Sequence, residues 1–306
     1  MKVGYAVLYE DGKLVISKNH TLLQKKIIKN YGKFEDTNVP WEKESDQIKR
    51  VQILDQVKSN CMREWFYDCI NLMTLIDFKN LDVSDCVDFS YMFFNCKSLQ
   101  NINEVQTWNV SNGTDFSYMF YNCQLLQDLN RLEIWNVSNG TDFSYMFDSC
   151  NSLQNLNELQ NWNISNGTDF SYMFAYCASL QNLNGLQNWN VSNGIDFSGM
   201  FYRCNSLQNL NELKNWNISN GIDFSCMFAN CKSLQDLNGL QTWNVSNSTK
   251  SSDMFYNCQS LQEISLSNTL DILTKDMFKK CNPNLKIHWK NHIYTYEDLL
   301  EYQTIY

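Results

Sequence analysis

Cysteine recurs along the chain every 27 residues, and a thiol can bind zinc, form a disulfide or act as a nucleophile. Zinc sites generally need two cysteines close in sequence, as in Cys-x-x-Cys, and the sequence contains no such pair. Bridges between neighbouring repeats would leave unpaired members and strain the stack. We therefore expect free thiols, buried as small apolar side chains, and no bound metal. The periodic cysteines are Cys69, Cys96, Cys123, Cys150, Cys177, Cys204, Cys231 and Cys258.

Aspartate keeps the same period, and stacked carboxylates could bind calcium between coils. Calcium-binding repeats are dense in Gly and Asp, whereas here one Asp stands before each apolar stripe with helical spacing. An Asp at that point is a natural helix N-cap. We favour capping, and calcium binding remains the alternative. The residues are Asp88, Asp115, Asp142, Asp169, Asp196 and Asp223.

Neither asparagine nor histidine indicates a catalytic or modified site. Asn-x-Ser recurs in each repeat, as at Asn163, and matches a glycosylation acceptor. The Asn-x-Ser motif directly follows the periodic tryptophan in each repeat. We therefore interpret it as a hydrogen-bonded corner of the coil and not as a glycosylation site. The histidines, His20, His288 and His292, lie outside the repeats. With no phosphate-binding loop or nucleophile elbow, we expect neither an enzyme nor a cofactor.

The elements that position these residues follow from the repeat, which tryptophan marks from Trp108 to Trp243. Phe170, Met173, Phe174 and Cys177 have the i, i+3, i+4, i+7 spacing of one helix face. The preceding leucines, Leu-x-x-Leu-x-x-Leu, predict a short strand and a tight corner. The fold class is therefore an α/β solenoid similar to leucine-rich repeats. We expect a right-handed superhelix with one short parallel strand and one short helix per 27-residue coil.

Capping segments are expected at both ends of the array. Residues 1–60 are predicted to form an N-terminal cap with a hairpin over 5–16, a helix over 22–31 and a strand over 48–54. Residues 61–265 form the array of repeats. Residues 266–306 form a shortened closing coil and a C-terminal cap, because Met-Phe returns after 23 residues instead of 27.

Charge and hydropathy limit the partners. The chain has 24 Lys plus Arg against 33 Asp plus Glu, for a formal charge of −9, so nucleic acid is a poor partner. No apolar stretch approaches the roughly 20 residues of a transmembrane helix. The N-terminus becomes acidic too early for an export signal.

The caps at both ends of the array bear on the oligomeric state. Because capped solenoids stop growing, we expect a monomer.

Residues 62–281 resemble the BspA-like leucine-rich repeats of mycoplasma lipoproteins and other surface proteins. The strings that carry the resemblance are Trp-Asn-Ile-Ser-Asn at residue 162, Asp-Phe-Ser-Tyr-Met-Phe at 169 and Cys-Ala-Ser-Leu at 177. The resemblance implies adhesion or partner binding at a cell surface. Without an export signal or a lipidation cysteine, the cytoplasm remains an alternative location. The leucine motif is one residue longer than usual, and alternation of Glu with Gly at the extra position indicates an exposed bulge.

The predicted function is therefore a non-enzymatic scaffold that binds a protein or a glycan through its strand face. The alternatives are a structural or self-assembling protein and an intracellular interaction module. Strand residues that vary between coils are expected to line a concave surface and contact the ligand. These residues are Asn101, Glu104, Asp128, Arg131, Asn155, Glu158, Asn182, Asn209, Glu212 and Asp236.

Overall fold

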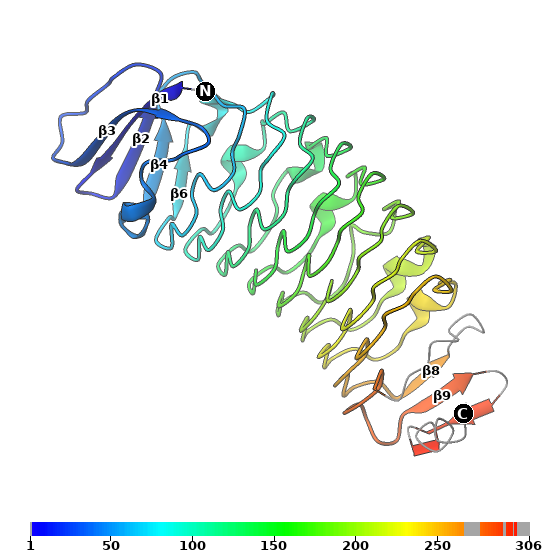
Figure 1. Ribbon diagram of the computed structural model, residues 1–306. Helices are drawn as coiled ribbons and strands as arrows, with labels where there is room; N and C mark the ends of the chain where they lie inside the picture. Colours follow the sequence, from blue (N-terminus) through cyan, green and yellow to red (C-terminus); the bar gives the residue numbers. More distant parts are fainter. Residues whose placement is uncertain (1, 266–275, 290–291, 296, 299–306) are drawn as a thin grey trace.

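The computed structural model describes residues 2–265, 276–289, 292–295 and 297–298. The chain forms a repeat solenoid, a single row of stacked coils that bows along its length and has a small β-sheet at each end (Figure 1). The expectation for residues 266–275, at the start of the C-terminal cap, lies outside the described residues.

A five-stranded sheet in the order β3-β1-β2-β4-β6 closes the N-terminal end. β1 and β2 pair antiparallel across a turn in which Gly12 has a φ of 76°. β2, β4 and β6 are parallel, and β6 belongs to the first coil, so the sheet continues into the solenoid. The elements are β1 (Lys2–Tyr9), β2 (Lys13–Ser17), β3 (Ile27–Glu35), η1 (Glu42–Gln47), β4 (Arg50–Ile53), β5 (Val57–Lys58), β6 (Thr74–Ile76) and β7 (Leu81–Asp82).

The helix expected over residues 22–31 is wrong, because the second half of that stretch belongs to β3, which pairs antiparallel with β1. Ile27 and Ile28 are 38% and 40% exposed, so they do not form the buried face of an amphipathic helix. The open edge of β1 offers backbone partners along its whole length, and a short isolated helix is marginal in water.

The helix expected in each coil is also wrong. Between Asp169 and Cys177, alternate backbone N–H groups donate to carbonyls of the next coil, and the residues between them close tight turns. Tyr172 and Tyr176 have φ angles of 53° and 57°, which an α-helix cannot contain. The apolar spacing therefore comes from a run of turns. The donors are Phe170, Tyr172, Phe174 and Tyr176, which bond to the carbonyls of Asp196, Ser198, Met200 and Tyr202 at 2.6–2.9 Å. We call this part of each coil, from the periodic Asp to the periodic Cys, the ladder segment.

The parallel pairing between coils also lies in the ladder segment, since isolated parallel bridges join Asp88 to Asp115 and continue along the Asp series to Lys250. In the Leu-rich half, where strands were expected, backbone bonds between coils are scattered, and short 3-10 helices take their place. A spacing of three residues between leucines equals one turn of 3-10 helix. The helices are η2 (Phe78–Asn80), η3 (Asn103–Val105), η4 (Leu132–Ile134), η5 (Asn157–Leu159), η6 (Asn211–Asn215) and η7 (Asn238–Leu240).

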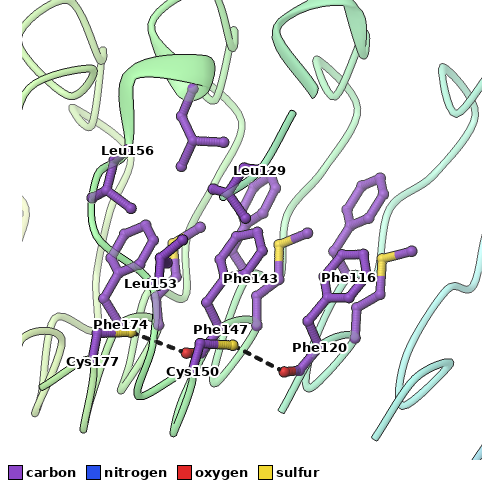
Figure 2. Packing of buried hydrophobic residues seen from close by; sticks show 14 of the residues in the cluster. Phe116, Phe120, Leu129, Phe143, Phe147, Cys150, Leu153, Leu156, Phe174 and Cys177 are labelled. Atoms are coloured by element: carbon purple, nitrogen blue, oxygen red, sulfur yellow. Dashed lines mark hydrogen bonds between the residues drawn. The ribbon is translucent and has the colours of Figure 1, made fainter. Parts of the chain in front are cut away.

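The core consists of columns of identical side chains, one from each coil, and Figure 2 shows the phenylalanine, leucine and cysteine columns. The periodic cysteines are buried, as expected. The Cys150 thiol donates a hydrogen bond to the carbonyl of Phe120 in the preceding coil, at 3.3 Å (Figure 2). The Trp162 indole donates to the Leu132 carbonyl at 2.7 Å. Both residue types therefore tie neighbouring coils together while filling the core.

The coils are closer together on the ladder side than on the tryptophan side. Stacked rings of one column are nearly parallel, so the distance between their centroids measures the local spacing of the coils. This distance is 4.5–4.8 Å for the tyrosines of the ladder segments, 5.3–5.8 Å for the core phenylalanines, and 6.2–6.4 Å for the stacked tryptophans. The solenoid therefore bends toward its ladder segments. The concave surface expected on the Leu-rich half lies on the ladder side instead.

A shortened coil continues the stack at the C-terminal end. The Phe255 N–H donates to the Met277 carbonyl at 3.0 Å, and the rings of Phe255 and Phe278 stack at 5.4 Å. A three-stranded sheet in the order β10-β9-β8 follows. Its strands are β8 (Glu263–Ser265), β9 (Lys286–Trp289) and β10 (His292–Tyr294).

Candidate functional site

The outward side chains of the ladder segments form one surface, which we call the ladder face. Along it runs a stack of four half-buried tyrosines, the tyrosine column, with ring planes within 8° of parallel. Because each ring lies against its neighbours, the column presents ring edges and hydroxyls to solvent. Burial raises the pKa of Tyr118 to about 12, so its hydroxyl stays protonated near neutral pH. The column consists of Tyr91, Tyr118, Tyr145 and Tyr172.

The backbone beneath the tyrosine column is left-handed, with φ between 53° and 57° at all four residues. For a residue other than Gly or Asn this conformation costs about 1 to 2 kcal/mol. Each tyrosine therefore occupies a position that Asn or Gly would fill at lower cost. The fifth coil has Gly199 there, at φ 58°, and the ring of Tyr172 lies over it. Ring stacking offsets part of this cost.

A second column, the asparagine column, occupies the position before each periodic Cys. Its backbone is also left-handed, with φ near 60° in every coil from Asn95 to Asn257. The Asn122 side-chain amide donates to the Asn95 side-chain carbonyl at 2.6 Å, and Asn257 donates to Asn230 at 2.7 Å. Asparagine suits both the left-handed backbone and the amide ladder. In three consecutive coils it is replaced by Ser149, Tyr176 and Arg203.

The Asp series caps turns of the ladder segments rather than helices. Oδ1 of Asp142 accepts hydrogen bonds from the N–H and the hydroxyl of Ser144, at 2.9 and 2.6 Å. Burial, together with the carboxylates of Asp169 and Asp115, raises the pKa of Asp142. Within the described residues, no three His, Cys, Asp or Glu side chains are grouped as a metal site.

One charged residue of the ladder face is buried. Asp148 is 3% exposed and accepts a hydrogen bond from the Ser149 hydroxyl at 2.6 Å. It occupies the position that Tyr121 fills in the preceding coil and Ala175 in the next. Burial raises the pKa of Asp148 to about 7. The aromatic stack of Phe94 and Tyr121 thus ends at a carboxyl group that titrates near neutral pH.

A cleft of about 440 Å³ lies where the N-terminal segment meets the first coils. Tyr67 and Tyr91 line it, so the tyrosine column begins at its wall. Arg63 lies over the Tyr91 ring at 5.6 Å and forms an ion pair with Glu64 at 3.2 Å. The ladder face therefore has a hollow at its N-terminal end that the sequence did not predict.

The ten residues predicted to contact a ligand lie in the Leu-rich halves and not on the concave side. Nine of them lie in or beside the 3-10 helices, and Asn182 lies in a coil that has turns in place of such a helix. Oδ1 of Asn155 accepts from the Asn157 N–H at 3.3 Å, so this side chain closes a local turn. Glu104 accepts from the Phe78 N–H of the preceding coil at 3.2 Å. Ligand binding at the ten positions stays a prediction. The same local turn recurs at Asn101, Asp128, Asn182, Asn209 and Asp236.

The three remaining predicted positions, like Glu104, hold the extra residue of the leucine motif. Arg131 is exposed, whereas Glu158 and Glu212 are half-buried. A hydrogen bond with the Glu133 carboxyl group, together with burial, raises the pKa of Glu158. Gly185 and Gly239 take the same position and are buried, so the position expected to be an exposed bulge is exposed at Glu104 and Arg131 but not at the two glycines. A Cβ on Gly185 would lie 2.0 Å from the backbone oxygen of the preceding coil, so glycine is required by close packing.

Sequence reasoning missed the tyrosine column because it assigned these residues to the surface of a helix. A signal was present, since Tyr follows Phe-Ser in four consecutive coils while varying later in the array. A residue that is polar at one end, aromatic and repeated on the surface is more typical of recognition than of core packing.

Comparison with known proteins identifies the repeat. The profile of the family described as "Mycoplasma protein of unknown function, DUF285" matches residues 41–156, 103–209 and 182–289. The chain belongs to this family, which confirms the resemblance to the mycoplasma type of repeat. No curated protein matches the sequence. None of the described helices is long and apolar enough to cross a membrane.

Solved leucine-rich repeat proteins are similar over nearly the whole chain. A leucine-rich cell surface protein from Faecalibacterium prausnitzii is 14% identical, with 97% of this chain and 96% of that chain covered and a TM-score of 0.36. A leucine-rich repeat protein from Eubacterium ventriosum is 12% identical, with coverage of 91% and 93% and a TM-score of 0.31. One from Bacteroides ovatus is 12% identical, with coverage of 94% and 98% and a TM-score of 0.30.

Proposed function

We propose that the protein is a non-enzymatic scaffold that binds a protein partner through its ladder face. The observation that carries this proposal is the tyrosine column, four stacked tyrosines held at left-handed backbone positions on the concave side. Folding alone favours Asn or Gly at such positions. A side chain retained against its backbone preference, and left partly exposed, is typical of a binding surface.

The geometry of the column favours a protein over a glycan. Sugars are commonly held by the open face of an aromatic ring, but the inner ring faces here are covered by the next tyrosine, as between Tyr118 and Tyr145 at 4.5 Å. Ring edges and phenol hydroxyls remain available, and they suit the mixed polar and apolar surface of a protein. Several equivalent contacts along a rigid row add avidity.

Several expectations from the sequence enter the proposal unchanged. These are the division into residues 1–60, 61–265 and 266–306, the right-handed winding and the monomeric state. Adhesion at a cell surface is the setting that the family resemblance implies. The second candidate site is the group of ten polar residues in the Leu-rich halves, because side chains such as exposed Arg131 line hollows there.

The two faces can be separated by paired variants in a pull-down from an extract of the native cell or its host. Tyr118→Asn with Tyr145→Asn removes the centre of the tyrosine column, and Asn fits the left-handed backbone. Asp128→Lys with Asp236→Lys reverses charge in the Leu-rich halves. We expect a protein captured by the wild type to be retained by the Lys variant and lost by the Asn variant.

The opposite pattern would assign binding to the Leu-rich halves and reject the ladder face. Size-exclusion chromatography tests the structural alternative, because a self-assembling protein would form polymers whose size increases with concentration. Circular dichroism and a thermal melt of both variants serve as the folding control.

A further inference from the structure

The asparagine column is interrupted in three consecutive coils near the middle of the ladder face. Ser149, Tyr176 and Arg203 replace asparagine there, and the column resumes at Asn230. The backbone does not change, since φ is 57° at Tyr176 and 60° at Arg203. Both side chains are therefore held in a conformation that favours Asn or Gly.

The substitutions also remove a stabilising contact. Elsewhere the side-chain amides of this column donate to one another between coils, as Asn122 does to Asn95 at 2.6 Å. Tyr176 and Arg203 cannot continue that amide ladder. In these adjacent coils the asparagine favoured by the backbone is absent, and so is its side-chain hydrogen bond. Such a loss indicates that these residues serve a purpose other than folding.

The new side chains form a compact cluster. The guanidinium carbon of Arg203 lies 5.3 Å from the ring centre of Tyr176 and 5.5 Å from that of Tyr202. The two rings meet edge to face, with centroids 5.3 Å apart and planes 77° apart. Two aromatic rings therefore hold the guanidinium in place while its side chain stays exposed.

Arg203 contacts these two rings and forms no ion pair with an acidic side chain in the part of the chain that the structure describes. A positioned guanidinium with free N–H groups suits a carboxylate, which it can bind with two parallel hydrogen bonds. Tyr and Arg are also the residue types most enriched at the energetic centres of protein interfaces.

We infer that Arg203, Tyr176 and Tyr202 form a subsite that binds the carboxylate of an Asp or Glu side chain in a protein partner. The inference rests on the proposed function, because it places the subsite on the ladder face. A protein carboxylate is favoured over an acidic sugar because the guanidinium lies over a face of each ring, where a sugar would stack, and the two rings meet edge to face rather than forming an open platform.

Fluorescence anisotropy with a labelled decaglutamate peptide at low salt tests the subsite. Arg203→Asn restores the asparagine that the next coil has at this position, Asn230, so the new residue suits the left-handed backbone. Lys43→Asn is the control: Lys43 is also an exposed cation, but it lies in η1, outside the ladder face and outside the Leu-rich halves. We expect Arg203→Asn to weaken peptide binding by about tenfold or more and Lys43→Asn to change it by less than about twofold.

Three outcomes would overturn the inference. The wild type could fail to bind decaglutamate, both variants could lose binding equally, or Arg203→Asn could bind as the wild type does. If hyaluronan oligosaccharide binds in an Arg203-dependent way while decaglutamate does not, the carboxylate comes from a glycan and the protein partner is rejected. Loss of the captured protein in the Tyr118 and Tyr145 variant would still support the ladder face, so the two proposals can fail separately.

Discussion

The ring of Tyr172 lies directly over Gly199 of the next coil, so close that a Cβ on Gly199 would be 2.4 Å from the ring. The tyrosine column ends at this contact. Gly199 also has a φ of 58°, which makes glycine the favoured residue on two independent grounds. Gly199 therefore ends the tyrosine column, and its lack of a side chain leaves room for the ring of Tyr172.

Substitution of this glycine separates the two effects. Gly199→Ala should lower the free energy of unfolding by about 1 to 2 kcal/mol from the left-handed backbone, plus a further amount for displacing the Tyr172 ring. Gly32→Ala provides the control, because Gly32 has a φ of 68° and nothing within 4 Å of the added Cβ. Urea denaturation measures both. Equal losses for the two variants would show that the ring contact contributes nothing.

Core and surface positions of the ladder segment should respond differently to truncation. Phe170 is fully buried and stacks between Phe143 and Phe197, at 5.8 and 5.6 Å. Phe170→Ala should therefore cost roughly 3 to 5 kcal/mol of unfolding free energy. Tyr202→Ala removes a half-buried ring and should cost under about 1 kcal/mol. Denaturant titration of the two variants gives the comparison, and similar costs would contradict the assignment of inner and outer faces.

The repeat length, the buried columns and the stacking could be predicted because they depend on which residues recur, and that is visible in one sequence. The local conformation could not. The i, i+3, i+4, i+7 pattern of Phe170 to Cys177 fits a helix or a run of turns equally well. What decides between them is the hydrogen bonding of Tyr172 and Tyr176 to the next coil, a contact between residues 26 positions apart. The mistaken helix also hid the ladder face, because it placed the concave side on the Leu-rich half.

The thiols should be protected by the fold rather than by pairing. Burial raises the pKa of the Cys150 thiol well above its usual value, and it donates to a backbone carbonyl. We expect all 12 cysteines to react with a thiol reagent after denaturation without reductant. In the native protein the reaction should be confined to the three partly exposed thiols, Cys61, Cys226 and Cys281. Fewer than 12 reactive thiols after denaturation would indicate disulfides.

Asp148 should make stability depend on pH. Burial raises its pKa from an ordinary value of 3.8 to about 7, with a hydrogen bond from Ser149 acting in the opposite direction. Between these two values the unfolded chain has released this proton while the folded chain still holds it. Stability therefore falls as pH rises through this window and levels off above about pH 7, with a total change of roughly 4 kcal/mol. The negative charge of Asp148 also contributes to raising the pKa of four tyrosines, which are Tyr118, Tyr121, Tyr145 and Tyr176.

Asp148→Asn replaces the titrating carboxyl group with a neutral amide of the same shape. The variant should match the wild type near pH 3, where the wild-type carboxyl is protonated in both the folded and the unfolded state, and should be more stable than it at pH 8. Urea denaturation at intervals of one pH unit gives both curves, and the difference between them isolates this residue from other titrating groups. A constant difference across the whole range would show that the buried carboxyl does not titrate near neutral pH.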